Sequence, residues 1–227
     1  MHQLEKLNQR IIKCKKCPRL SSYIRKISKE KVKRFQAEKY WGRPLPGFGD
    51  FTAELLIIGL APAAHGGNRT GRMFTGDSSG DWLAKVLYEN SFASKSTSER
   101  VDDGFRLINA YITASVRCAP PENKPLREEL DSCSRFLKEE LYLLRNAWVI
   151  VCLGKIAFDS CCKLLDIKAA KFVHGKVYNH RKWKIICSYH PSRQNTQTGR
   201  LTWDQWSEVF SKAKLILENR LHYSNIN

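Results

Sequence analysis

The segment AELLIIGLAPAAHGGNRTGRMFTGD (residues 53–77) contains the feature that decides the fold class. Residues 53–60 form an apolar run, which is typical of a strand buried on both faces, as the strands of parallel sheets are. The run leads into a Gly-rich loop that ends at Asp77. Ligands of open α/β sheets bind beyond the carboxyl ends of the strands, so we expect this loop to line a binding site.

Three further apolar runs have the character of buried strands, and helical patterns separate them. The runs are LINAYITASV (107–116), WVIVCLG (148–154) and WKIICSY (183–189). The helical patterns cover residues 2–13, 79–90, 126–144, 155–165 and 203–220. This alternation predicts an α/β fold, a three-layer α/β/α arrangement around a central, mostly parallel four-stranded sheet. The segment 20–50, basic and then rich in Pro and Gly, is typical of a long irregular connection.

The charge of the chain points to a polyanionic partner. Lys and Arg number 39 against 22 Asp and Glu, which gives a formal net charge of +17. Residues 10–43 contain 13 of the basic residues and only two acidic ones, Glu30 and Glu38. Such an arm favours nucleic acid, whose counterions are released on binding, over a small neutral ligand, with a solvated surface as the alternative.

No apolar run approaches the ~20 residues that a membrane-spanning helix needs. The first twenty residues also lack the apolar core of a secretory signal. We therefore expect a soluble, intracellular, cytoplasmic protein without a membrane partner.

Eight cysteines fall into two kinds of surroundings. They are Cys14, Cys17, Cys118, Cys133, Cys152, Cys161, Cys162 and Cys187. Cys14 and Cys17 form a C-x2-C pair in a basic context, which suits one metal centre, with a redox pair as the rival. Cys118 in a polar turn and Cys133 are the best candidates for two more ligands, although Cys133 also suits a helix core. The remaining four are typical of small buried hydrophobes.

Several polar and aromatic residues in the loops after the strands are candidates for a functional role. Each of them also has a structural interpretation. Phe74 suits stacking on a planar ring, or filling the core. Asp77 suits orienting water or facing a positive charge, or capping the next helix. His65 and His190 suit donation to an anionic leaving group, or local backbone contacts. The triphosphate-binding GxxxxGK[ST] pattern and the metalloprotease HExxH pattern are absent from the sequence.

Four motifs together closely resemble the family 5 (type b) uracil-DNA glycosylases. They are CKKC (14–17), GLAPAAHGGNRTGRMFTGD (59–77), RCAPPENKP (117–125), with a cysteine fifteen positions after Cys118, and SYHPSRQNTQTGRLT (188–202). The resemblance implies a single domain with the α/β/α fold of that family, over residues 1–227. It implies a [4Fe–4S] cluster bound by Cys14, Cys17, Cys118 and Cys133, which ties in the arm formed by about residues 1–50.

The resemblance also implies an activity and its residues. A monomeric enzyme of this kind flips uracil, or another deaminated base, out of DNA and hydrolyses its N-glycosidic bond, which initiates base excision repair. The implied catalytic residues are Asp77, His190 and Asn123. The implied substrate-binding residues are Phe74, Leu60, Ala61, His65, Arg193 and Asn195. The loop Pro191–Thr198 would enter the duplex.

Two departures from related families bear on specificity. Residues 60–63 are apolar where those families place a polar residue, and Ala114 stands where sister families place an Asn that reads uracil. We therefore expect weaker discrimination for uracil and a broader range of damaged bases. The alternative function is a non-catalytic nucleic-acid-binding protein with a structural four-Cys zinc site.

Overall fold

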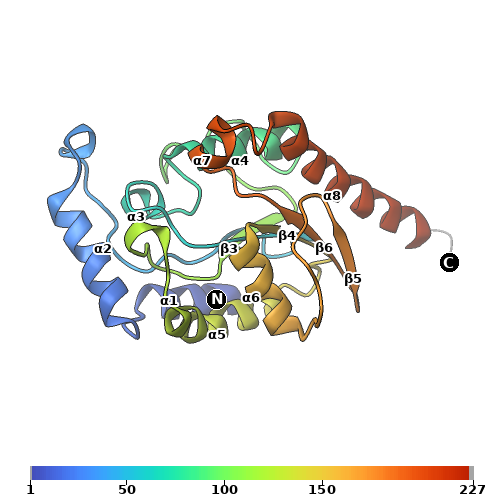
Figure 1. Ribbon diagram of the computed structural model, residues 1–227, viewed down its shortest axis with the longest axis horizontal. Helices are drawn as coiled ribbons and strands as arrows, with labels where there is room; N and C mark the ends of the chain where they lie inside the picture. The colour runs from blue at the N-terminus through green and yellow to red at the C-terminus, as the bar shows by residue number, and fades with distance from the viewer. Residues whose placement is uncertain (1, 225–227) are drawn as a thin grey trace.

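A computed structural model describes residues 2–224, and the side chains of residues 2–220. A sheet lies between two layers of helices (Figure 1). Its strands are β1 (Phe48–Gly49), β2 (Leu55–Gly59), β3 (Ala110–Ala114), β4 (Val149–Leu153), β5 (Val177–His180) and β6 (Trp183–Ser188). The helices are α1 (Gln3–Ile12), α2 (Pro18–Glu30), α3 (Gly67–Thr70), α4 (Ser78–Glu89), α5 (Arg127–Leu143), α6 (Lys155–Leu165), α7 (Arg193–Gln197) and α8 (Trp203–Ser224).

The sheet confirms the α/β class and the four predicted strands, but it has six strands in the described residues rather than four. The strand order is β1-β3-β2-β4-β6-β5, and the four central strands run parallel. The two outer strands, β1 and β5, pair antiparallel to their neighbours. The sequence did not predict them because β1 has only two residues and β5 is polar and half-buried.

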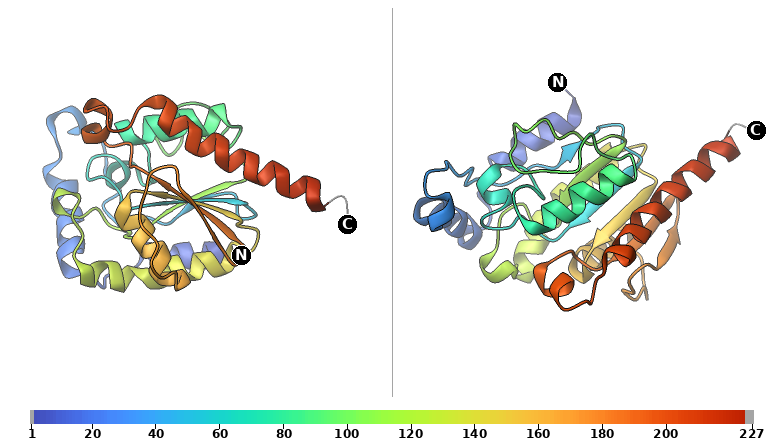
Figure 2. Two further views of the ribbon diagram at one scale, coloured as in Figure 1. Left: turned by 45° about the vertical axis from the view of Figure 1, so that its right-hand side comes forward. Right: turned by 90° about the horizontal axis from the view of Figure 1, so that it is seen from above.

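Each face of the sheet is covered by its own layer (Figure 2). Helices α4 and α8 pack on one face, where Trp206 and Phe210 of α8 are fully buried. Helices α1, α5 and α6 pack on the other, around Phe136 and Phe158. The central strands β2, β3 and β4 are buried at every position, which explains their continuous apolar sequences.

The basic segment 20–50 was predicted wrongly as irregular throughout, because its first part is the helix α2. Pro18 occupies the first turn, where a missing N–H has no cost. Leu20 and Ile24, one helical turn apart, are buried while the cations face outward. The many Lys and Ser residues of α2 concealed this short apolar stripe. None of the helices in residues 2–224 is both long and apolar enough to cross a membrane.

Candidate functional site

A pocket of about 620 Å³ lies at the carboxyl edge of the sheet. Loops that follow β2, β3, β4 and β6 all line it, as expected for a parallel sheet. The predicted site residues that line it are Leu60, Ala61, Phe74, Asp77, Asn123, His190 and Arg193. The structure therefore brings seven of the nine predicted catalytic and substrate-binding residues around one pocket.

The remaining two, His65 and Asn195, are not among the residues that line this pocket. His65 faces a neighbouring groove, where its Nδ1 lies 3.0 Å from the hydroxyl oxygen of Tyr40. The side-chain amide of Asn195 donates to the carbonyl oxygen of His190 at 2.8 Å. Asn195 therefore braces the loop that carries His190.

Asp77 is the N-cap of α4 and lines the pocket as well. Its Oδ1 accepts hydrogen bonds from the backbone N–H of Ser79 at 3.0 Å and of Gly80 at 2.9 Å. Its Oδ2 lies against Gly66, where a β-carbon would come within 1.8 Å. Asp77 therefore caps α4, but the cap uses only Oδ1, and the carboxylate still lines the pocket.

Burial raises the pKa of Asp77 above its ordinary value. The two cap N–H groups and the positive charges of Arg69 and Arg193 oppose this rise. A carboxylate taken out of water without a direct ion pair is suited to stabilising a positive charge that develops beside it.

Phe74 stands in a conformation that a bulky side chain rarely adopts, with φ of 50°. Two glycines make room for it. A β-carbon on Gly59 would lie 2.9 Å from its ring, and one on Gly80 would lie 2.5 Å from its carbonyl oxygen. Such strain at a binding site is held by the surrounding structure and fixes the ring in one place.

His190 follows β6 and lies across the pocket from the loop that begins at Leu60. Its ring centroid is 5.8 Å from that of Phe74, with the two planes inclined by 34°. Burial lowers the pKa of His190 to about 4. The imidazole is therefore neutral near pH 7 and keeps one N–H for donation to a ligand.

Asn123 ends a short 3-10 turn, Pro121–Asn123, and is exposed at the rim of the pocket. Its φ is 56° and that of Glu122 is 53°, so two successive non-glycine residues hold left-handed conformations. The turn therefore aims its side chains in a direction that an ordinary turn would not.

A second groove of about 770 Å³ adjoins the pocket and shares Asp77, Asn123 and Arg193 with it. Its basic lining residues are Arg34, Arg69, Arg100 and Arg193, and its acidic ones are Glu38, Asp77, Asp81, Glu99 and Glu122. Arg34 and Arg193 are exposed and form no ion pair among the described residues. They are free to contact phosphate groups.

The cysteines separate into two sets of four, in line with their sequence surroundings. Cys152, Cys161, Cys162 and Cys187 are buried between β4, β6 and α6, which confirms their prediction as small core residues. In the other set, Cys17, Cys118 and Cys133 pack in one apolar cluster beside Leu20 and Val116.

Cys14 belongs to the same neighbourhood as Cys17, Cys118 and Cys133. Burial raises the pKa of Cys17 to about 11, and the nearby thiols of Cys133 and Cys14 add to the rise. Burial and the same three thiols raise the pKa of Cys118. Within residues 2–220, however, no three His, Cys, Asp or Glu side chains are grouped closely enough to hold a single metal ion.

Positively charged and polar groups surround these thiols. The guanidinium of Arg135 donates to Cys14 Sγ at 3.7 Å. The backbone N–H of Arg117 donates to Cys133, and Ser132 donates to Cys17. Such donors stabilise sulfur that carries negative charge, as a metal-bound thiolate does.

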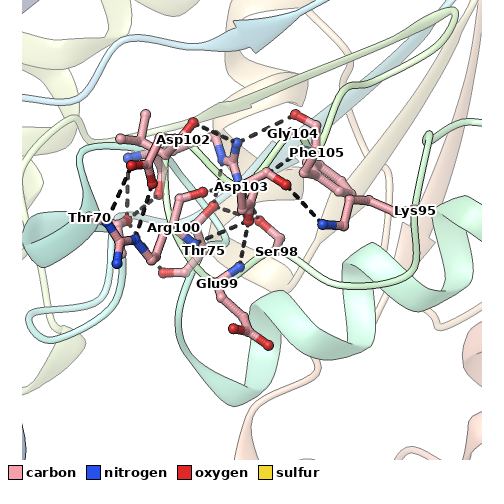
Figure 3. A network of polar contacts seen from close by, with 12 residues as sticks. Thr70, Thr75, Lys95, Ser98, Glu99, Arg100, Asp102, Asp103, Gly104 and Phe105 are labelled. Atoms are coloured by element: carbon pink, nitrogen blue, oxygen red, sulfur yellow. Dashed lines mark hydrogen bonds and ion pairs between the residues drawn. The ribbon is translucent and has the colours of Figure 1, made fainter.

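No role was predicted for Arg72, which is buried at 7% exposure in the loop after β2. It pairs with both carboxylate oxygens of Asp103 at 2.9 Å and donates to the hydroxyl oxygens of Thr75 and Ser98. Figure 3 shows Thr75, Ser98 and Asp103 gathered in this network. It also donates to the carbonyl oxygen of Arg100 at 2.7 Å. Arg72 therefore ties the segment between Phe74 and Asp77 to the loop 98–105. The only signal in the sequence was a pair of arginines, Arg69 and Arg72, in a loop with a single acid, Asp77.

Comparison with known proteins agrees with the resemblance. The family model of the uracil DNA glycosylase superfamily matches residues 46–214. A type-5 uracil-DNA glycosylase of Thermus thermophilus is 47% identical over 209 residues, 91% of this chain and 94% of that protein. One of Pyrobaculum aerophilum is 45% identical over 204 residues, 90% and 89% of the two chains. A type-4 uracil-DNA glycosylase of Archaeoglobus fulgidus is 29% identical over 199 residues, 85% and 83%.

Proposed function

The chain belongs to the uracil-DNA glycosylase superfamily, and we propose that it hydrolyses the N-glycosidic bond of uracil in DNA. One observation carries the proposal: four loops bring Phe74, Asp77, Asn123 and His190 to one pocket. A pocket of about 620 Å³ accommodates a nucleobase together with its sugar.

The base reaches the pocket only after it leaves the duplex, which costs roughly a few kcal/mol. Stacking on Phe74 and phosphate contacts from Arg34 and Arg193 offset this cost. The loop from Pro191 to Thr198 enters the space left in the duplex. Its exposed side chains, including Gln194 and Gln197, suit contact with the opposite strand.

Cleavage breaks the bond between the sugar C1′ and the base nitrogen, and the electron pair leaves with the base. Asp77 stabilises the positive charge that develops on the sugar and orients a water, which adds to C1′. The neutral imidazole of His190 donates a hydrogen bond to the anionic base, and Asn123 holds its edge. The proton released by the water passes to Asp77 or solvent, and the departing base takes up a proton.

Apolar residues border the pocket where a base would be read. Leu60, Ala61 and Ala114 line it and offer no side-chain hydrogen bond. A pocket without a polar side chain for the base has no buried hydrogen-bonding group that a different base would leave unpaired. The free-energy penalty against such a base is therefore small. We therefore propose activity on other deaminated bases as well as uracil.

We also propose a [4Fe–4S] cluster held by Cys14, Cys17, Cys118 and Cys133. A single zinc ion would hold four thiolates about 2.3 Å from one centre, whereas a multi-iron cluster spreads its ligands over several metal atoms. Four neighbouring thiols match the four cysteine ligands that such a cluster takes. The cluster would link α1 and α2 to the end of β3 and to α5, with no part in bond cleavage.

The test is an assay on a duplex with one uracil, followed by hot alkali, which breaks the strand at an abasic site. Strand breakage supports the enzyme, and its absence leaves the nucleic-acid-binding alternative. A panel with hypoxanthine and other lesions measures specificity. Iron content and absorbance near ~400 nm test the cluster, and colourless protein with bound zinc would contradict it. We propose a monomer that acts inside the cell, which gel filtration and localisation would check.

A further inference from the structure

The side chain of Arg69 is buried at 7% exposure, yet it links three separate segments. Its Nε donates to the carbonyl oxygen of His65 at 2.8 Å, and its Nη2 donates to that of Gly76 at 2.9 Å. Its Nη1 donates to Glu38 Oε2 at 2.5 Å. The carbonyl of Gly76 belongs to the peptide that leads into Asp77, so Arg69 holds the residue next to the carboxylate.

The segment Phe35–Gly42, which we call the strap, lies along α3 and encloses Arg69. The guanidinium carbon of Arg69 is 3.8 Å from the centroid of the Phe35 ring. The backbone N–H of Trp41 donates to the carbonyl oxygen of Arg69 at 2.9 Å. These contacts, together with the ion pair to Glu38, hold the guanidinium between the strap and the loop.

The strap also contacts His65, the neighbour in sequence of the glycine that packs against Asp77. The hydroxyl group of Tyr40 lies 3.0 Å from His65 Nδ1, and the residue after His65 is Gly66. A β-carbon on Gly66 would meet Asp77 Oδ2 at 1.8 Å, and one on Gly76 would meet Arg69 Nη2 at 2.2 Å. The backbone of Gly66 therefore lies directly against Asp77, and Arg69 lies directly against Gly76, the residue before Asp77.

We propose that the strap positions Asp77 for catalysis, with Arg69 and Glu38 as the positioning residues. The proposal rests on the proposed function, because it takes Asp77 as the catalytic carboxylate. Without Glu38, the buried guanidinium loses its only ion pair among the described residues and gains by moving toward water. That movement releases the carbonyl of Gly76 and shifts Asp77 away from the sugar.

The test compares Glu38→Ala with the matched control Glu30→Ala in the full chain. Both residues are exposed acids of the arm, and both variants raise the net charge equally, but the ion pair of Glu30 is made with Lys26 on its own helix. The single-turnover rate on a uracil duplex should fall about tenfold in Glu38→Ala and stay unchanged in Glu30→Ala, because a small misplacement of a catalytic group is costly. The Kd for DNA should be equal in the two variants, and Glu38→Gln should restore part of the rate.

Equal single-turnover rates in Glu38→Ala and Glu30→Ala would overturn the proposal, as would a loss in Glu38→Ala that appears only in Kd. An inactive wild-type protein would instead contradict the proposed function. Hydrogen exchange of residues 74–80 gives a readout without activity, and protection should decrease in Glu38→Ala alone.

A second variant, Arg69→Gln, tests the electrostatic part through the pH profile of the single-turnover rate. The charged groups that face Asp77 are Arg69, Arg193 and Asp81. Removing the positive charge of Arg69 makes the Asp77 carboxylate harder to ionise. The acid limb of the profile, where the rate falls at low pH, should therefore move to higher pH. An acid limb at the wild-type position would show that Arg69 does not act on Asp77.

Discussion

The two walls of the pocket are built differently. The wall formed by the loop after β2 carries Phe74 and Asp77, and buried Arg69 and Arg72 brace it through ion pairs and hydrogen bonds. The wall formed by the loop after β6 carries His190 and the short helix α7, and most of its side chains beyond residue 192 are exposed. A rigid wall costs no reorganisation as charge develops on the sugar, and an exposed wall is free to meet DNA. We therefore expect changes in the first to alter chemistry or stability, and changes at the rim of the second to alter binding.

The largest effect is expected for Asp77→Asn. The single-turnover rate should fall about 10³-fold, because the amide cannot stabilise positive charge. Asn is as good an N-cap as Asp, so Tm and DNA affinity should remain near wild type. Asp81→Asn, on the same helix, is the control. A near-normal rate in Asp77→Asn would show that Asp77 only caps α4 and has no catalytic role.

The next largest effect is expected for Arg72→Lys, which should lower the free energy of unfolding by about 3 kcal/mol. Lysine cannot reproduce the buried contacts that the guanidinium makes with Asp103 and Ser98. Urea denaturation measures this, with exposed Arg106→Lys as the control. Against the desolvation that burial imposes, the N–H of Phe105 and the guanidinium of Arg72 hold the pKa of Asp103 at about 2. The stability that this carboxylate contributes is present above its usual pKa and is lost as pH falls toward about 2. An Arg72→Lys protein as stable as wild type would mean that this wall is not braced by the network.

His190→Ala should lower the single-turnover rate about 100-fold, because a hydrogen bond to the departing base is lost. Since burial lowers the pKa of His190 to about 4, protonation of His190 should not change wild-type activity between pH 6 and 7, where an ordinary histidine titrates. Activity should instead fall on acidification, as Asp77 becomes protonated at a pKa above its ordinary value. A rate that rises as pH falls through about 6.5 would instead show that a protonated His190 takes part.

The smallest effect is expected for Arg193→Ala at the exposed rim. The Kd for duplex DNA should rise about threefold, with the salt dependence reduced by the equivalent of about one phosphate contact. The single-turnover rate at saturating enzyme should barely change. Arg181→Ala, in the turn between β5 and β6, is the matched control and should leave Kd unaltered. A large loss of rate in Arg193→Ala would break the division between the two walls.

The sequence predicted the central sheet and most of the pocket for physical reasons. Runs such as 148–154 are apolar at every position because both faces of the sheet are covered, and the order of elements places their following loops at one edge. Those two facts were enough to bring Asp77 and His190 together. The role of Asn123 was predicted from the resemblance alone. The structure shows that Asn123 lies at the pocket, and its role stays a prediction.

Other features of the fold and the site could not be predicted, because they depend on contacts between residues far apart in the sequence. The short edge strand β1 exists only because β3 lies beside it, and the stripe of Leu20 and Ile24 in α2 is hidden among cations. The roles of Arg69 and Arg72 depend on acids 31 residues away, Glu38 before one and Asp103 after the other. Spacing within one loop could not have revealed either partner.

The route of the chain through the sheet has a consequence for biosynthesis. Strand β6 lies between β4 and β5, and it is the last strand of the sheet to be synthesised. At 5–20 residues per second, a ribosome needs on the order of ten seconds to proceed from Asp77 to His190. During that interval the nascent chain has one wall of the pocket and an unfinished sheet. The pocket is therefore complete only after β6 and the loop that follows it have been synthesised.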